Sequence, residues 1–336
     1  MTRAGGTLKK LINDPADAVD ELLEAFVAAH PDIVALPVPR VATRAVPAKG
    51  KVGITIGGGS GHEPAMIGYV GEGFADSAAA GNIFAAPGPD VILDSIRAAD
   101  HGRGVVLLYG NYSGDVLNCR LAIQRAVAEN IDVRAVYVSD DVASAPPGEA
   151  EKRRGIAGDI IVFKAAGAAA ETGMSLDDVE RIARSANANT YSMGVALSGA
   201  ELPGAPAPTF ECGPDEMEAG LGIHGEPGVS RQTLGTADEV GTLLAERILD
   251  DFEPPPGTKV VVLVNGLGAT PSLELYLVYR SVRRLLEERG IDVVRTYIGE
   301  FITSLQMAGL SVTVTKLDDE LLSLLDAPAR TVRFVQ

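Results

Sequence analysis

Two of the four histidines stand in sequence contexts suited to chemistry. His62 follows a stretch, residues 57–61, in which four of five residues are glycine, and His224 lies in a second glycine-rich stretch, residues 220–228. A Glu-Pro pair follows each histidine within three residues. Glycine lets a backbone approach a small ligand closely, and imidazole transfers protons near neutral pH. The residues alone support equally an acid–base pair and two turn histidines hydrogen-bonded to the backbone.

Asp115 is the third candidate, because its loop follows the apolar run 105–109. That run is expected to be a strand next to the strand that precedes His62, so the two loops would meet at one sheet edge. A carboxylate beside an imidazole fixes its tautomer or accepts a substrate proton, which contributes about 10²- to 10⁴-fold in rate. The alternative is a capping aspartate of the following helix. His30 and His101 are expected to be solvated capping or surface residues.

The glycine stretch does not match a nucleotide-binding loop. A P-loop requires lysine and a hydroxyl residue where His62, Glu63 and Pro64 stand, and the third glycine of a dinucleotide fingerprint would fall on His62. Residues 266–268 form only a partial pattern. The sequence therefore predicts neither an ATP site nor another bound cofactor. No metal site is predicted either, because Cys119 and Cys212 lack metal-ligand spacing and are expected to be free thiols.

Composition limits the possible partners. A formal net charge of −16 and the lack of a clustered basic face argue against nucleic acid, and 5% aromatic residues leave little for base stacking. No apolar run approaches the roughly 20 residues of a membrane span. The chain is expected to be cytoplasmic and soluble, without membrane contact.

The predicted fold is α/β, with two domains at residues 1–190 and 191–336. Each domain is expected to hold a mostly parallel or mixed sheet flanked by helices, with the substrate site at strand-end loops near the domain junction. Residues 78–82 are expected to lead towards the helix at 91–98, and no strand is assigned to them. Strands are predicted at 52–56, 105–109, 133–138, 191–198, 260–264, 293–298, 310–316 and 332–335. Helices are predicted at 15–30, 91–98, 116–127, 159–171, 176–187, 236–253, 272–289 and 318–325.

Taken together, these segments resemble the substrate-binding K subunit of dihydroxyacetone kinases, the DhaK family. The resemblance runs over nearly the whole chain and rests on residues 10–15, 57–64, 80–85, 111–118, 155–158, 220–228 and 265–271. It implies a two-domain α/β homodimer that binds a short-chain ketose. It also implies a separate L subunit, with its ADP or ATP and magnesium or a phosphotransferase relay, as phosphoryl donor, so a glycerone kinase of glycerol metabolism is expected.

The resemblance also implies roles for individual residues. His224 would add to the ketone carbon and form a hemiaminal, His62 would be the acid/base beside it, and Asp115 would be the base for the phosphorylated hydroxyl. The substrate would be lined by Gly59, Ser60 and Gly61, together with His62 and Asp115.

One position departs from the family, since many members carry lysine where this chain has Gly110. A ketose related to dihydroxyacetone, such as the four-carbon erythrulose, becomes an alternative substrate. A second alternative is a non-catalytic, ketose-sensing co-activator. The presence of both His62 and Asp115 favours the enzyme, because sensing needs neither acid nor base. A generic sugar-binding protein would leave the matching loops unexplained.

Overall fold

The structure is a computed structural model that describes residues 9–226 and 228–336. It is an α/β fold with two mixed six-stranded sheets flanked by helices, as predicted. The chain forms two compact units, each built around one sheet. We name them after a central strand: the β3 unit (residues 19–139, 159–189 and 318–336) and the β11 unit (residues up to 18, 140–158 and 190–317).

The sheet of the β3 unit has four parallel strands extended by an antiparallel hairpin. In spatial order its strands are β1 (Val34–Val38), β2 (Val41–Arg44), β5 (Ser77–Ile83), β3 (Gly53–Ser60), β6 (Val105–Gly110) and β7 (Val133–Val138). The strands from β5 to β7 pair in parallel, whereas β1, β2 and β5 pair antiparallel. Every residue of β3 and β6 is buried, which explains their continuous apolar runs.

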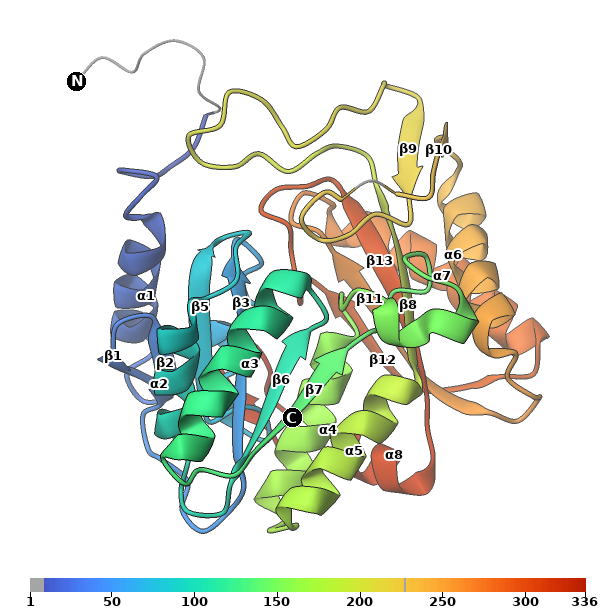
Figure 1. The fold of residues 1–336 in the computed structure, drawn as a ribbon. Helices are drawn as coiled ribbons and strands as arrows, with labels where there is room; N and C mark the ends of the chain where they lie inside the picture. The colour runs from blue at the N-terminus through green and yellow to red at the C-terminus, as the bar shows by residue number, and fades with distance from the viewer. Residues whose placement is uncertain (1–8, 227) are drawn as a thin grey trace. The chain divides into compact units, whose positions relative to one another are not determined.

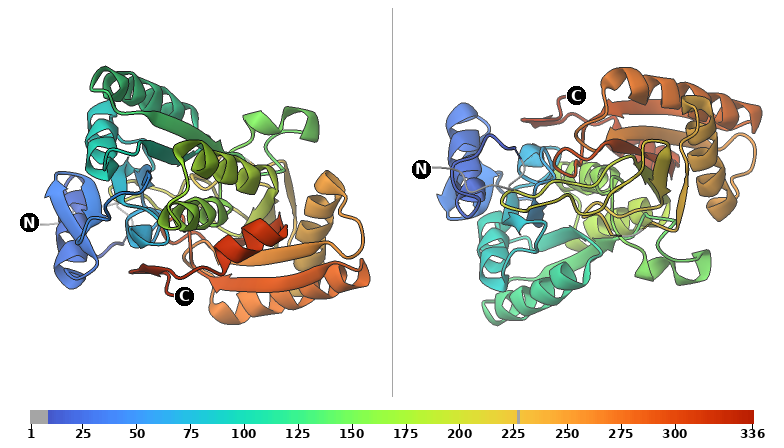
Figure 2. Two further views of the ribbon diagram at one scale, coloured as in Figure 1. Left: turned by 90° about the horizontal axis from the view of Figure 1, so that it is seen from below. Right: turned by 90° about the horizontal axis from the view of Figure 1, so that it is seen from above.

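Helices cover both faces of this sheet. The unit contains α1 (Ala18–Ala29), α2 (Pro89–Ala99), α3 (Ser113–Ala128), α4 (Asp159–Glu171), α5 (Leu176–Ala188), α8 (Asp319–Leu325) and the short 3-10 helix η1 (Ile67–Tyr69). The neighbouring α2 and α3 (Figure 2) pack on one face, where Leu107 and Tyr109 join their core. Alternate residues Val106 and Leu108 are also fully buried and point to the other face, which α4 and α5 contact.

The sheet of the β11 unit is mostly antiparallel. Its spatial order is β10 (Ser230–Thr233), β9 (Glu216–Ala219), β8 (Thr190–Ala196), β13 (Gly309–Lys316), β11 (Lys259–Gly266) and β12 (Asp292–Gly299). Only β11 and β12 pair in parallel. The helices α6 (Ala237–Phe252) and α7 (Ser272–Glu288) lie side by side and pack on this sheet (Figure 1). The 3-10 helix η2 (Pro147–Lys152) belongs to the same unit.

Two helices begin at capping residues. The Thr236 side chain accepts the N–H of Glu239, whose own side chain accepts the N–H of Thr236, so both halves of a capping box start α6. At α5, the Ser175 side chain accepts the N–H of Asp178. These local bonds fix where the helices begin.

The two units interleave along the chain and differ from the predicted division at residue 190. One crossing does fall after Asn189, and the others follow Ala18, Ser139, Gly158 and Leu317. Residues 318–336 belong to the β3 unit because α8 packs on α4, where buried Lys164 donates to the carbonyls of Leu324 and Ala327 at 3.0 and 2.8 Å. The strand β14 (Arg330–Thr331) then pairs with β4 (Gly71–Glu72).

Two local predictions were wrong, and one strand was missed. Residues 78–82, to which no strand was assigned, lie in the strand β5, which pairs with β2 on one side and β3 on the other. The run predicted as strand 332–335 is replaced by the two-residue strand β14. The strand before His62 does not end at Ile56, since β3 continues through the glycines to Ser60.

Candidate functional site

His62 and Asp115 follow neighbouring strands of the β3 unit. The strands β3 and β6 pair in parallel, from Gly53 with Val105 to Ile56 with Leu108. The carboxyl ends of parallel neighbours lie at the same edge of a sheet. The prediction that the two loops leave one edge is therefore confirmed.

The glycines before His62 are required by packing within the strand. A methyl group on Gly57 would lie 2.2 Å from the hydroxyl oxygen of Tyr109, and one on Gly59 would lie 2.7 Å from the amide nitrogen of Ala85. Both distances are shorter than any carbon contact allows. Only Gly61, with φ of +97°, needs glycine for a left-handed conformation. The glycine-rich stretch thus brings a neighbouring chain segment close to the start of the histidine loop.

His62 is held in a buried, partly aromatic environment. Its side chain is 1% exposed and its ring stacks on Phe84, with ring centroids 4.8 Å apart and an angle of 11° between the planes. The Ser60 hydroxyl donates to the carbonyl of Gly81 at 2.8 Å, and both carboxylate oxygens of Glu63 accept the N–H of Gly61. Burial raises the pKa of Glu63 against the effect of these backbone bonds. The sequence carries no signal for Phe84, which follows β5.

Asp115 lies in the first turn of α3 and is 8% exposed. The N-cap residue of this helix is Tyr112, so Asp115 is not the capping residue. The amino end of a helix favours a negative charge, which suits a carboxylate at this position. Its carboxylate therefore sits at the strand-end edge of the sheet rather than in a capping role.

Gly110, the last residue of β6, is buried and packs closely beside this loop. A methyl group there would lie 3.3 Å from the ring of Tyr112 and 3.5 Å from Oδ2 of Asp159, the first residue of α4. Asp159 is 1% exposed. Sequence reasoning missed this aspartate, which adds a second carboxylate near the end of β6.

His224 lies in the β11 unit, in the loop of a hairpin formed by β9 and β10. These strands pair antiparallel from Glu216 with Thr233 to Ala219 with Ser230. The sequence analysis missed the hairpin, although residues 216–219 alternate polar and apolar side chains as a half-buried strand does. The histidine therefore belongs to a short loop whose two ends are fixed by strand pairing.

The His224 side chain is paired with Glu226. Its Nδ1 lies 3.0 Å from Oε1 of Glu226, and its backbone N–H donates to Oε2 at 3.0 Å. Burial acts to raise the pKa of Glu226, but the hydrogen bond and charge of the imidazole, with two backbone N–H groups, lower it to about 2. An ionised Glu226 can only accept a hydrogen bond, so it favours the tautomer of the neutral ring in which Nδ1 carries the proton and Nε2 the lone pair.

Two further contacts hold the histidine loop. The Ser304 hydroxyl donates to the carbonyl of Ile223, the residue before His224. The segment before Ser304 is fixed by Asn265. The side-chain oxygen of Asn265 accepts the N–H groups of Phe301 and Ile302, each at 2.9 Å. Asn265, the first residue of the family-matching segment 265–271, therefore supports the histidine loop indirectly, by fixing the segment before Ser304.

The His224–Glu226 pair should give this protein a distinct acid sensitivity. Because the folded pKa of Glu226 is lowered, its stabilising contribution is complete above pH 4.5 and is lost as the pH falls to about 2. We expect Glu226→Gln to lower the unfolding free energy by about 1–2 kcal/mol at pH 5 and to change it little at pH 2. The range allows for solvent screening, because the Glu226 side chain is 31% exposed. Urea unfolding from pH 2 to 5 measures the difference. In a His224→Ala background the substitution should have a much smaller effect, and an equal effect would contradict the pairing.

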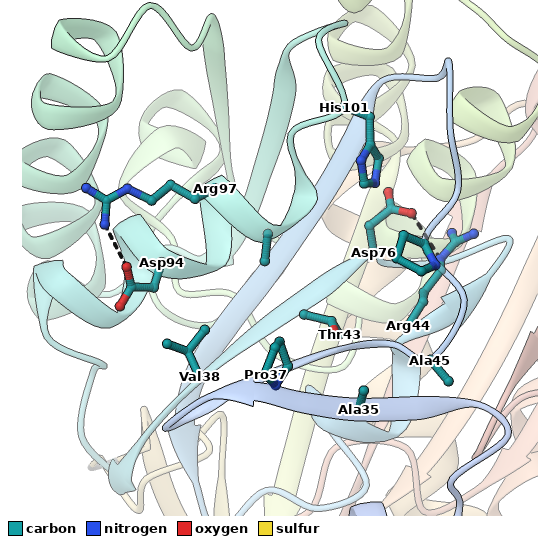
Figure 3. Close-up of a pocket in the computed structure, with 12 residues that line it drawn as sticks. Ala35, Pro37, Val38, Thr43, Arg44, Ala45, Asp76, Asp94, Arg97 and His101 are labelled. Atoms are coloured by element: carbon teal, nitrogen blue, oxygen red, sulfur yellow. Dashed lines mark hydrogen bonds and ion pairs between the residues drawn. The ribbon is translucent and has the colours of Figure 1, made fainter.

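A separate cavity of about 530 Å³ lies elsewhere in the β3 unit, beside β1, β2 and α2 (Figure 3). It holds His101 but none of the candidate residues. Its charged groups are paired, Arg97 with Asp94 at 2.7 Å and Arg44 with Asp76 at 3.0 Å. Pairing leaves these groups little reactivity, so the cavity is not the candidate site.

Other sequence predictions concern thiols, metals and membranes. Cys119 and Cys212 are free thiols, as predicted. Among residues 9–226 and 228–336, no three His, Cys, Asp or Glu side chains are grouped as metal ligands would be. None of the helices in the described part of the chain has the length and apolar character that crossing a membrane requires.

Comparisons with known proteins agree with the resemblance. The Dak1 domain family matches residues 24–333. The chain is 42% identical, over 97% of its length and 99% of the relative, to the dihydroxyacetone-binding subunit DhaK of PTS-dependent dihydroxyacetone kinase 2 from Listeria innocua.

Two other relatives differ in the function their names give. The chain is 46% identical, over 96% of its length, to an L-erythrulose 1-kinase of Mycolicibacterium smegmatis, of which it spans 57%. The solved structure of the dihydroxyacetone kinase operon co-activator Dha-DhaQ matches with a TM-score of 0.89 at 32% identity, covering 96% of this chain and 99% of that one. Relatives of this chain thus include a subunit of a dihydroxyacetone kinase, an erythrulose kinase and an operon co-activator.

Proposed function

The chain belongs to the Dak1 domain family of ketose-binding kinase subunits, and we propose that it holds a short-chain ketose as a hemiaminal on His224 while a separate subunit delivers the phosphoryl group. The observation that carries this proposal is the 3.0 Å contact between Nδ1 of His224 and the Glu226 carboxylate. This contact favours the tautomer with the lone pair on Nε2, the nitrogen proposed as the nucleophile, on a side chain that is 22% exposed.

Addition of His224 to the ketose is balanced by proton transfer. A bond forms between Nε2 and the ketone carbon, the π electrons of the carbonyl move to its oxygen, and that oxygen takes a proton. The imidazole ring becomes positively charged, and the adjacent Glu226 carboxylate stabilises this charge. Only a carbonyl compound can react, so glycerol and other polyols are rejected by chemistry rather than by fit.

We assign the proton on the carbonyl oxygen to His62, which acts as general acid here and as base when the adduct breaks down. Its stacking on Phe84 restricts the ring to one plane, and a positioned acid is more effective than a mobile one. Gly59, Ser60 and Gly61 would line the substrate through their backbone, because the Ser60 hydroxyl is bonded to Gly81.

Asp115 would remove the proton of the ketose hydroxyl as this oxygen attacks the phosphoryl group. The covalent link to His224 would fix that hydroxyl for in-line attack. The phosphoryl donor, with ATP and magnesium or a phosphotransferase relay, is expected on a partner subunit. We expect this chain to form a homodimer.

The residue at position 110 would influence which ketose is bound, because a methyl group on Gly110 would already lie 3.3 Å from the ring of Tyr112 and 3.5 Å from Oδ2 of Asp159. We expect Gly110→Lys to shift the ratio of kcat/KM for dihydroxyacetone over erythrulose upward at least 10-fold, since the new side chain must displace Tyr112 and brings an ammonium close to Asp159. The control is Gly110→Met, which adds similar bulk without charge. If neither variant changes the ratio, residue 110 does not select the substrate.

The proposed function is tested by a coupled assay with a purified L-type partner. Dihydroxyacetone, glyceraldehyde and erythrulose are compared for turnover, while the adduct is followed by NMR of the ¹³C-labelled carbonyl carbon. We expect a tetrahedral carbon resonance and turnover with at least one ketose. Absence of the adduct with every ketose would contradict the proposal.

A ketose-sensing co-activator is the second candidate, favoured by the similarity to the Dha-DhaQ structure. Such a protein needs the adduct but not the acid and base. His62 and Asp115 both lie at the strand-end edge of one sheet, which favours the kinase subunit. Adduct formation without turnover, in the presence of a partner active with another K subunit, would support the sensor.

A further inference from the structure

The segment 140–158 is fixed both to β8 and to itself. The N–H of Ser192 in β8 donates to the carbonyl of Asp140 at 2.7 Å. The buried Asp140 carboxylate accepts the N–H groups of Ile156 and Gly158, each at 2.8 Å. A methyl group on Gly158 would lie 2.5 Å from this carboxylate, so the bond requires glycine. The glycine motif at 155–158 is thereby explained as part of a rigid turn.

This turn presents Arg154 to the loop that carries His224. Two guanidinium nitrogens of Arg154 lie 2.9 and 2.8 Å from Oδ2 of Asp141, which is fully buried. The same guanidinium donates to the carbonyl of Gly220 at 3.0 Å. One side chain therefore joins a fixed carboxylate to the first residue of the histidine loop.

Arg154 also approaches the carboxylate that holds His224. A methyl group on Gly222 would lie 2.2 Å from Oε2 of Glu226 and 2.8 Å from Nη1 of Arg154. The carboxylate and the guanidinium thus lie against the same side of Gly222, close enough to attract each other. Within one unit, hydrogen bonds therefore run from Asp141 through Arg154 to Gly220, and the Glu226 carboxylate that holds His224 lies nearby.

We propose that Arg154 is a positioning residue for His224, acting on the histidine loop through the carbonyl of Gly220 and the carboxylate of Glu226. The inference rests on the proposed role of His224 and adds to it the group that holds the nucleophile in place.

The loop needs such support because its own backbone is permissive. Gly220 and Gly225 have φ of +74° and +80°, a conformation that glycine enters and leaves at little cost. Nucleophilic addition requires the reacting atoms about 3–3.5 Å apart with aligned orbitals. An anchored guanidinium with several donors suits this purpose, whereas an ammonium offers no planar fork.

The neighbouring Arg153 provides a matched control. It makes a bidentate pair with Asp251 of α6 at 2.8 and 2.6 Å and donates to the carbonyl of Ala145. Its side chain is 2% exposed, against 17% for Arg154. Exchange of either arginine for lysine removes a two-nitrogen contact with an aspartate from the same segment, so both variants report the structural cost.

The test compares Arg154→Lys and Arg153→Lys in the full chain with the L-type partner. For Arg154→Lys we expect the adduct dissociation constant and the KM for ketose to rise at least 10-fold, with kcat within about 3-fold of wild type. For Arg153→Lys we expect the adduct dissociation constant and the KM to stay within about 3-fold of wild type. Its midpoint of thermal unfolding should nevertheless fall at least as far as that of Arg154→Lys. A general structural loss would instead reduce the active fraction, and with it kcat, at unchanged KM.

Two results would overturn the inference. If wild type forms the adduct and Arg154→Lys binds ketose as tightly as wild type, Arg154 does not position His224. Equal losses of ketose affinity in both lysine variants would also contradict it, because Arg153 acts only on the structure of the segment. Failure of the wild-type protein to form any adduct is a different outcome that overturns the proposed function itself, and the positioning role with it.

Discussion

His224→Ala is expected to abolish the covalent ketose adduct and to lower turnover at least 10³-fold. The substitution removes the only atom proposed to bond with the ketone carbon. Water could add to the carbonyl instead, but it would not attach the ketose to the protein. Without the link, the ketose hydroxyl is no longer held for attack on the donor. The adduct is measured by NMR with ketose labelled at the carbonyl carbon, and turnover by the coupled assay with the L-type partner.

His30→Ala is the matched control for this substitution. His30 follows α1 and contacts Phe26 edge to face, with ring centroids 5.2 Å apart, and it belongs to no part of the candidate site. We expect this variant to retain adduct formation and turnover within about 3-fold. A crystal of His224→Ala soaked in ketose that still shows continuous density to another residue would contradict the assignment of the nucleophile.

The buried central strands could be predicted from sequence because a local run of apolar residues is enough to indicate them. The strands β6 and β11 are apolar runs with few interruptions, as strands covered on both faces must be. By contrast, β5 consists largely of alanine, serine and glycine, which are poor indicators of a strand. Its formation depends on pairing with β2 and β3, and the sequence of β5 alone does not indicate these partners.

The order of the units along the chain could not be predicted for a similar reason. The segment 140–158 joins the β11 unit through hydrogen bonds to β8, and α8 joins the β3 unit through packing on α4. These contacts connect residues that are distant in sequence. A change in composition near residue 190 indicates a change of environment but not which earlier or later segments share it.

The part of the candidate site that depends only on strand order could be predicted from sequence. His62 and Asp115 follow two parallel strands, and that was sufficient to bring their loops to one edge. The bond between His224 and Glu226, the stacking of Phe84 and the approach of Arg154 depend on loop conformations that no residue pattern specifies. The sequence therefore pointed to the groups that we propose to react but not to the groups that orient them.

Asp115→Asn is expected to keep the ketose adduct and to lose phosphorylation by about 10²- to 10⁴-fold in kcat. Asparagine retains the shape and one hydrogen-bond acceptor but cannot take a proton, so addition of His224 proceeds while attack by the hydroxyl is slowed. The adduct is measured by carbonyl-carbon NMR and kcat by the coupled assay at saturating ketose. The separation of these two readouts is what distinguishes a base from a residue that merely binds substrate.

The control is Asp90→Asn, which removes an aspartate from the first turn of α2, the position that Asp115 has in α3. Asp90 pairs with Arg125 on the surface, so its loss tests the general effect of a charge at a helix start. We expect kcat within about 2-fold of wild type for this variant. Turnover of Asp115→Asn near the wild-type rate would exclude Asp115 as the base, and loss of its adduct would assign it to binding instead. A lost kcat with an intact adduct would place the proton transfer after the covalent step, as the order of the proposed reaction requires.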